Sequence, residues 1–148
     1  MYKIRQATIE DTPEMMELIK ELALYENAPE EVTVSMEEFQ NLGFGPQPLW
    51  HAFVATHENN IVGMALCYFR YSTWKGKRLY LEDIVITEAH RRKGIGQLLM
   101  DACIEYGKAT NCHGMIWQVL DWNDSAMSFY KTYDAEFDEE WVNVSIMF

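Results

Sequence analysis

The chain reads Arg91-Arg92-Lys93-Gly94-Ile95-Gly96 between a strand-like run at residues 79–86 and a helix-like run that begins at Ile95. The first residues of a helix carry backbone N–H groups without intrahelical partners, and the helix dipole adds positive charge there. A helix start therefore favours bound phosphate, and glycine lets the backbone approach a ligand that a Cβ would hold away. We interpret the stretch as an anion-binding turn; an ordinary solvated basic turn is the alternative.

The stretch differs from two familiar phosphate-binding loops. A Walker loop requires lysine and then serine or threonine directly after its second glycine, and Gly96-Gln97-Leu98 lacks them. A dinucleotide fingerprint requires a third glycine three residues further on, where Leu99 stands. The remaining pattern predicts that the backbone N–H groups of residues 92–97 surround a pyrophosphate, with the basic side chains adding charge-assisted hydrogen bonds.

Strand-like and helix-like patterns alternate along the rest of the chain. The clearest amphipathic helix follows the glycines, because apolar residues from Ile95 to Tyr106 recur at helical spacing. A first helix runs from a cap at Asp11 or Thr12 to about Tyr25, and Ser35 caps a short helix that Gly43 ends with left-handed backbone. We also predict strands at residues 3–7, 51–56, 61–69, 79–86, 115–120 and 141–148, a helix at 125–132, and loops at 28–34 and 72–77. This order predicts one mixed α/β sheet with helices on both faces.

The composition predicts a single folded domain over residues 1–148, because 49% of the residues are hydrophobic. No apolar run approaches the roughly 18 residues of a membrane helix, and the N-terminus lacks a secretory signal, so we expect no membrane partner. Cys67, Cys103 and Cys112 favour free thiols and a cytoplasmic location, and Cys103 belongs to an apolar helix stripe. Neither the cysteines nor the four histidines have metal-ligand spacing, so we expect no metal.

The net charge of −11 disfavours a nucleic-acid partner, because phosphate backbones select basic surfaces. Acidic surroundings can steer a cationic substrate into a cleft. A merely acidic surface is the alternative, and the net charge does not distinguish the two.

The basic glycine stretch resembles motif A of the GNAT superfamily of acyl-CoA-dependent N-acyltransferases, in which this loop holds the pyrophosphate of CoA. Nearly the whole chain is similar to the diamine (spermidine/spermine) and thialysine N-acetyltransferases. The matches are co-linear, which makes them far more specific than the glycine motif alone. They are Ile19-Lys20-Glu21-Leu22-Ala23-Leu24-Tyr25-Glu26, Leu42-Gly43-Phe44-Gly45, Tyr68-Phe69-Arg70-Tyr71, Trp74, Leu79-Tyr80-Leu81-Glu82-Asp83, Gly94-Ile95-Gly96, Trp122-Asn123 and Phe129-Tyr130-Lys131.

The resemblance implies the GNAT fold, a single mixed and mostly antiparallel sheet flanked by helices on both faces. It also implies acetyl-CoA as the acetyl donor and a homodimer with acceptor contacts from both subunits. Arg92 departs from the family, in which a glycine is usual, and Thr132-Tyr133-Asp134 replaces two basic residues and a glycine. The implied CoA-binding residues are Ile84, Val85 and Ile86 for the pantetheine arm, Arg91, Arg92, Lys93, Gly94, Ile95, Gly96 and Gln97 for the pyrophosphate, and Asn123, Asp124, Ser125, Ala126 and Tyr130 for further contacts.

The chemistry of amine acetylation makes its own demands on the catalytic residues. An alkyl ammonium with a pKa near 10.4 loses its proton at pH 7 at a cost of about 4.6 kcal/mol, so the site must accept that proton. Glu82 is the candidate base, acting through water, and a charge contact without proton transfer is its alternative. Because successive strand residues point to opposite faces, we expect only one of Glu82 and Asp83 to reach the cleft. Tyr130 stands at the position of the family's general acid; a core tyrosine is its alternative.

The acceptor residues follow from the resemblance. Ser72-Thr73 is similar to the thialysine-preferring branch, whereas the polyamine-preferring branch resembles Asp-Pro there, so we favour thialysine or a lysine-like amine over long polyamines. A non-catalytic acyl-CoA or polyamine sensor and a protein-lysine acetyltransferase are the competing functions. The implied substrate-binding residues are Tyr25, Glu26, Ser72, Trp74, Glu82, Asp83, Ile116, Trp117, Gln118, Glu139 and Glu140.

Overall fold

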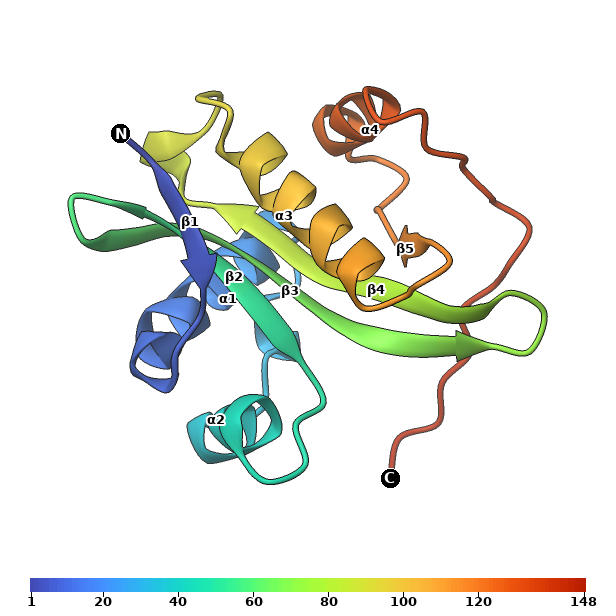
Figure 1. Cartoon of the computed structure of the whole chain (residues 1–148), viewed down its shortest axis with the longest axis horizontal. Coiled ribbons are helices and arrows are strands. Elements are labelled where there is room, and N and C mark those ends of the chain that lie inside the picture. The colour runs from blue at the N-terminus through green and yellow to red at the C-terminus, as the bar shows by residue number, and fades with distance from the viewer. The chain divides into compact units, whose positions relative to one another are not determined.

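The computed structural model describes residues 1–148 as two compact units, residues 1–117 and residues 118–148. Figure 1 shows the elements in chain order. None of the helices combines the length and the apolar character needed to cross a membrane. The first unit contains β1 (Lys3–Gln6), η1 (Ile9–Asp11), α1 (Thr12–Tyr25), η2 (Pro29–Glu31), α2 (Met36–Phe44), β2 (His51–His57), β3 (Asn60–Ser72), β4 (Gly76–Ile86), η3 (Glu88–His90), α3 (Ile95–Ala109) and β5 (Met115–Trp117), and the second contains α4 (Asp124–Lys131).

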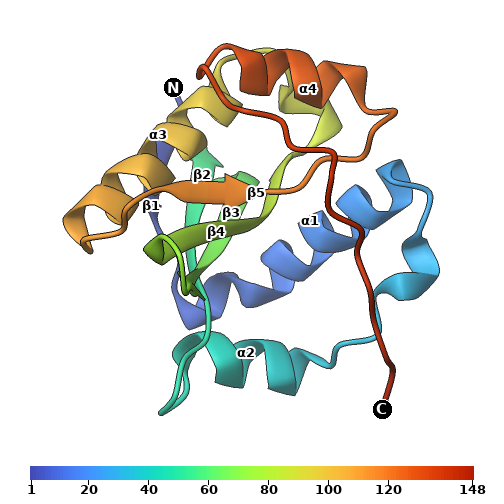
Figure 2. The same cartoon turned by 90° about the vertical axis from the view of Figure 1, so that its right-hand side faces the viewer.

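The first unit is built on one five-stranded sheet in the order β1-β2-β3-β4-β5. The first four strands pair antiparallel, whereas β5 pairs parallel to β4 because α3 carries the chain back between them. Helices α1 and α2 cover one face of the sheet and α3 covers the other (Figure 2). The predicted mixed, mostly antiparallel sheet with helices on both faces is therefore confirmed.

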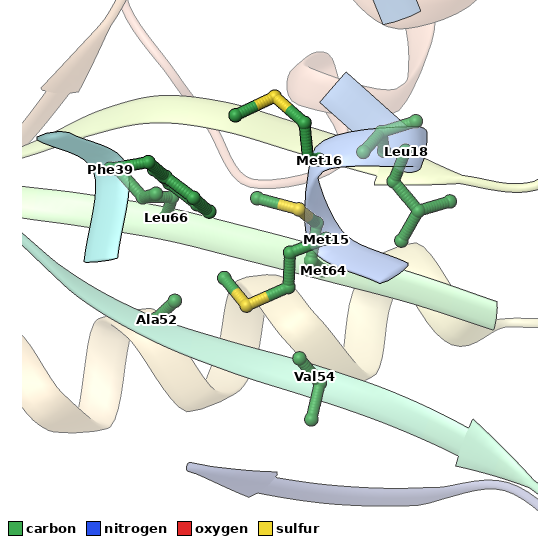
Figure 3. Packing of buried hydrophobic residues seen from close by; sticks show 9 residues of the cluster. Met15, Met16, Leu18, Phe39, Ala52, Val54, Met64 and Leu66 are labelled. Atoms are coloured by element: carbon green, nitrogen blue, oxygen red, sulfur yellow. The ribbon is translucent and has the colours of Figure 1, made fainter. Parts of the chain in front are cut away.

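A hydrophobic core lies between the sheet and helices α1 and α2 (Figure 3). Each fully buried side chain of this kind stabilises the fold by about 1.5–3 kcal/mol relative to an exposed one. The core positions α1, which supplies one wall of the site described below. Its buried members are Met15, Met16 and Leu18 from α1, Phe39 from α2, Ala52 and Val54 from β2, Met64 and Leu66 from β3, and Val85 from β4.

The predicted start of α2 is confirmed, because Ser35 Oγ accepts the N–H of Glu38 at 3.1 Å. Its predicted end was wrong: Gly43 lies inside the helix, which continues to Phe44. A Cβ at Gly43 would lie 2.1 Å from a ring carbon of Trp50. The glycine is thus required by the close approach of an indole ring and not by left-handed backbone.

The second unit, residues 118–148, contains α4 as its regular element. Asn123 caps this helix, since its Oδ1 accepts the N–H of Ala126 at 3.2 Å. The predicted strand at residues 141–148 was wrong, and β5 ends at Trp117 instead of residue 120. Val142, Val144 and Ile146 are more than 80% exposed. Alternating apolar residues form a strand only where a neighbouring strand pairs with their backbone, and this segment has no such neighbour in the structure.

Candidate functional site

The outer edge of β4 is open beyond Leu81. Strand β5 pairs only with residues 79–81, so the backbone of β4 from Glu82 onward has a strand partner only on the β3 side. The N–H of Thr87 donates to Val62 O on β3 at 2.9 Å, and backbone groups alternate in direction along a strand. The polar backbone groups of Val85 therefore point towards β3, while those of Ile84 and Ile86 point to the open edge.

The turn before α3 has the features that an anion requires. Gly94 has φ +82° and occupies the N-cap of α3, and a Cβ there would meet no protein atom within 4 Å. The first turn of α3 carries no acidic residue, and Arg92 and Lys93 are exposed. The N-terminal end of a 15-residue helix, with the positive end of its dipole, and two exposed cations fit a pyrophosphate group.

Arg92 has left-handed backbone, with φ +63°. This conformation favours glycine and costs a residue with a Cβ about 1–2 kcal/mol. The glycine that the resemblance implies at this position would avoid this conformational cost. Arg92 bears it.

Arg91 turns away from the other two cations. Its Nε donates to Ile86 O at 2.9 Å, its Nη2 lies 3.6 Å from Glu21 Oε1, and its guanidinium carbon lies 5.4 Å from the ring centroid of Tyr25. The side chain thus connects the end of β4 to α1.

A β-bulge places two carboxylates in the same pocket. Leu66 of β3 lies opposite Asp83 and the next residue, Cys67, lies opposite Leu81, so Glu82 is an extra residue on β4. A bulge re-aims the side chains that follow it. The expectation that only one of Glu82 and Asp83 reaches the cleft was therefore wrong. The pocket has a volume of about 370 Å³ and is lined by Ile19, Leu22, Ala23, Glu26, Glu31, Val32, Thr33, Val34, Glu82 and Asp83.

The electrostatics of this pocket favour a bound cation. Burial raises the pKa of Asp83 to about 7, and the negative charges of Glu82 and Glu26 contribute. Burial also raises the pKa of Glu26 above its usual range. Like charges held together disfavour ionisation, so a cation that enters the pocket stabilises the ionised carboxylates.

Several predicted acceptor residues of the first unit lie elsewhere. Ser72 and Trp74 form the tip of the β3–β4 hairpin, where Ser72 Oγ accepts the N–H groups of Trp74 (3.2 Å) and Lys75 (3.0 Å). Trp74 is 82% exposed, and the hairpin tip is about 20 Å along β4 from Glu82 at the usual rise per strand residue. The structure therefore does not bring Ser72 and Trp74 into the acidic pocket. Ile116 and Trp117 lie on β5, opposite Tyr80 and Leu81.

The remaining predicted site residues belong to the second unit. Asp124, Ser125 and Ala126 form the first turn of α4, and Tyr130, further along the same helix, is 7% exposed. Gln118 Nε2 donates to Asn143 Oδ1 at 2.8 Å, and the Glu140 N–H donates to Asp138 Oδ1 at 3.0 Å. Like Glu140, Glu139 lies in a segment outside helices and strands.

The cysteines carry free thiols, as predicted, and Cys103 is fully buried. The neighbouring Cys103 thiol and burial together raise the pKa of Cys67. A thiol held protonated is a poor nucleophile, which argues against a covalent acyl intermediate on Cys67. No group of three or more histidine, cysteine, aspartate or glutamate side chains is placed to hold a metal ion.

Sequence reasoning missed two parts of the site. The loop at Glu31–Val34 lines the pocket, although its sequence indicated only a loop. Glu21 was noted only as part of a matching segment, yet its Oε1 accepts the N–H of Glu88 at 3.1 Å. The cluster of acidic residues next to Val32 was the one local sequence signal for the role of the loop. The contact of Glu21 with Glu88 joins residues 67 apart in the chain and leaves no local sequence signal.

Comparison with known proteins agrees with this geometry. The chain matches the model of the acetyltransferase (GNAT) family over residues 12–134. It is 38% identical to the thialysine N-epsilon-acetyltransferase of Bos taurus, covering 90% of this chain and 83% of that protein. It is 33% identical to the spermidine/spermine N(1)-acetyltransferase-like protein 1 of Homo sapiens, covering 95% of this chain but 22% of that protein.

The fold matches solved structures as well. An aminoglycoside acetyltransferase from an uncultured soil metagenomic sample superposes with a TM-score of 0.81 at 22% identity, over 99% of this chain and 96% of that one. At this sequence identity the match supports the fold alone. From the family match and the close relatives it follows that the chain belongs to the acetyltransferase (GNAT) family.

Proposed function

We propose that this protein transfers an acetyl group from acetyl-CoA to a primary amine of a small cationic substrate, of the thialysine or lysine type, by direct attack in a ternary complex. One observation carries the proposal. Glu82 and Asp83 line the acidic pocket, and the next residue, Ile84, lies on the open edge of β4. An amine held by the carboxylates therefore lies beside the strand edge to which the pantetheine arm of CoA would bind.

The pocket suits a small amine with an aliphatic chain. Its acidic members attract an ammonium group, and its apolar members, among them Ile19 and Leu22, pack against methylene groups. A volume of about 370 Å³ is at the lower end for small-molecule sites. These features suit the ammonium and methylene groups of a free amino acid or a diamine.

The carboxylate pair would remove the proton from the ammonium group. Bound acetyl-CoA would supply the acetyl thioester that the neutral amine attacks. We assign the proton to Glu82, through water, with Asp83 beside it as a second acceptor. The raised pKa of Asp83, about 7, suits proton transfer at neutral pH, because a general base works best when its pKa lies near the operating pH.

Residues of the turn before α3 would hold the CoA pyrophosphate. We assign its contacts to the backbone N–H groups of residues 92–97 and to the side chains of Arg92 and Lys93. The φ of Gly94 and the absence of protein atoms over it support this assignment. The open backbone of Ile84, together with the N–H of Ile86, whose carbonyl accepts from Arg91 Nε, is our candidate for the pantetheine arm.

The second unit would contribute the general acid. We assign Tyr130 to protonation of the departing CoA thiolate, as the family resemblance implies, and Asn123, Asp124, Ser125 and Ala126 to further CoA contacts. We propose that residues 1–148 form one acetyltransferase domain, because the family match at residues 12–134 runs through both units.

We further propose a cytoplasmic homodimer whose subunits both contribute acceptor contacts. Ser72 and Trp74 stand exposed at a hairpin tip far from the pocket of their own chain, as residues that act on a partner's site would. Free thiols in all three cysteines suit a reducing compartment.

The test is release of free thiol from acetyl-CoA in the presence of single amines. The panel contains thialysine, lysine, a short diamine, spermidine and a lysine-containing peptide. We expect amine-dependent release that is fastest with thialysine or lysine. Binding of CoA without release for any amine would contradict catalysis and favour a sensor, and preference for the peptide would favour a protein acetyltransferase.

A further inference from the structure

Glu21 connects α1 to the turn that follows β4. Its Oε1 accepts the N–H of Glu88 at 3.1 Å and lies 3.4 Å from Thr87 Oγ1. Thr87 and Glu88 begin the short connection that leads from β4 through η3 to the anion-binding turn. One carboxylate on α1 therefore holds the start of that connection.

Arg91 closes the same contact from the other end of the connection. Its Nη2 lies 3.6 Å from Glu21 Oε1, and its Nε donates to Ile86 O at 2.9 Å. The guanidinium group also lies over the ring of Tyr25, one helical turn after Glu21. Residues 87–91 are thus held at both ends by α1 and by the last residue of β4.

Helix α1 also forms a wall of the acidic pocket. Leu22 and Glu26 line the pocket, and they immediately follow Glu21 and Tyr25 in the chain. The helix that contacts the amine is therefore the helix that holds the connection to the anion-binding turn. Packed side chains and the ion pair of Glu21 with Arg91 therefore form a continuous connection between the two sites.

We propose that Glu21 and Arg91 form a clamp that positions the CoA-binding turn and couples it to the amine pocket. Arg91 is then a positioning residue that acts through Glu21 and Ile86, and not a ligand of the pyrophosphate. Its Nε and Nη2 are directed at those two partners. The inference rests on the proposed function, since it takes CoA as the ligand of this turn.

The clamp is tested by a double-mutant cycle on CoA affinity, measured by titration calorimetry with free CoA. We expect Glu21→Ala and Arg91→Ala each to weaken CoA binding about five- to tenfold. The double variant should bind CoA as well as the single variant with the lower CoA affinity, because the effects of residues in one network are not additive. In Glu21→Gln the amide oxygen still accepts the Glu88 N–H, so we expect a loss of about two- to threefold. Multiplicative losses in the double variant would overturn the proposal.

Two control variants separate the clamp from direct contacts and from general damage to α1. Lys93→Ala removes an assigned phosphate contact, so its loss should multiply with that of Glu21→Ala. Glu17→Ala lies on the same helix with a side chain that is 76% exposed, and it should leave CoA affinity unchanged. We also expect Glu21→Ala to lower kcat/KM for the amine, whereas Lys93→Ala should raise KM for acetyl-CoA alone.

Hydrogen exchange provides a readout that does not depend on CoA. Loss of the clamp should speed exchange of the backbone amides of residues 88–95 in Glu21→Ala relative to Glu17→Ala. Unchanged exchange overturns the clamp. If exchange is faster in Glu21→Ala but the unsubstituted protein neither binds CoA nor acetylates amines, the proposed function is overturned and the clamp is retained.

Discussion

Glu82 and Asp83 are consecutive residues of β4, yet both line the same pocket. In a regular strand they would point to opposite faces of the sheet. The extra residue at the bulge opposite Leu66 and Cys67 removes that alternation. Two carboxylates consequently share one pocket, where burial, and after it the negative charges of Glu82 and Glu26, raise the pKa of Asp83 to about 7.

The rate of acetylation should depend on the ionisation of Asp83. If the ionised carboxylate is required, kcat/KM for the amine rises with pH through an apparent pKa of about 7. Asp83→Asn should remove this limb of the profile and lower kcat/KM. Glu82→Gln removes one of the negative charges that raise the pKa of Asp83, so the limb should shift to lower pH. If the rise of kcat/KM with pH persists unchanged in Asp83→Asn, it reports the ionisation of another group.

The same carboxyl group should make stability depend on pH. Because the pKa of Asp83 is raised from 3.8 to about 7 on folding, its neutral form stabilises the fold at low pH, and this contribution is lost as pH rises towards 7. Asp83→Asn should therefore be more stable than the original protein at pH 8 by about 1–3 kcal/mol, allowing for solvent around a partly buried group. The difference should be smaller at pH 4, as urea denaturation at the two pH values can show. Equal differences in stability between the two proteins at pH 4 and pH 8 would contradict the raised pKa of Asp83.

Arg92 offers a test of backbone strain in the turn before α3. Arg92→Gly relieves the cost of φ +63°, partly offset by the greater freedom of glycine in the unfolded chain, so stability should rise by up to about 1 kcal/mol. Lys93→Gly is the matched control and should lower stability, since the φ of Lys93 is not in the left-handed region. Thermal unfolding compares the two, and a loss of stability in Arg92→Gly would speak against strain.

Tyr130 is expected to act in turnover and not in binding. Removal of its hydroxyl in Tyr130→Phe should lower kcat by about 10²–10³, with the affinity for CoA nearly unchanged, because a positioned general acid contributes on this scale. Tyr133→Phe, three residues further along the chain, is the control. Turnover that survives Tyr130→Phe would remove this residue from the mechanism.

Substrate preference should respond to charge at the hairpin tip. Ser72→Asp introduces a carboxylate at the position where the polyamine-preferring branch resembles Asp-Pro. An aspartate can still accept the N–H groups of Trp74 and Lys75. We expect kcat/KM for spermidine to rise relative to thialysine by about two- to fivefold, the range of a solvent-exposed charge contact. Ser72→Asn keeps the shape without the charge and should leave the preference unchanged.

Most of the fold could be predicted because its signals are local. Helical spacing from Ile95 to Tyr106 and the cap at Ser35 each depend on contacts within a few residues of the chain. The glycine of the anion-binding turn belongs to the same class, since φ at Gly94 is a property of one residue. The segment at residues 141–148 failed because an alternating pattern does not specify a pairing partner.

Sequence by itself therefore determined the family, the sheet with its covering helices and the glycine turn that begins α3. Tertiary structure decided that Glu82 and Asp83 share a pocket, that Glu26 joins them, and that Arg91 turns onto α1 instead of the turn it precedes. The bulge arises from the register between β3 and β4, and the contact of Glu21 with Arg91 spans about 70 residues of chain. Such pairings depend on how distant segments pack, which local propensity does not encode.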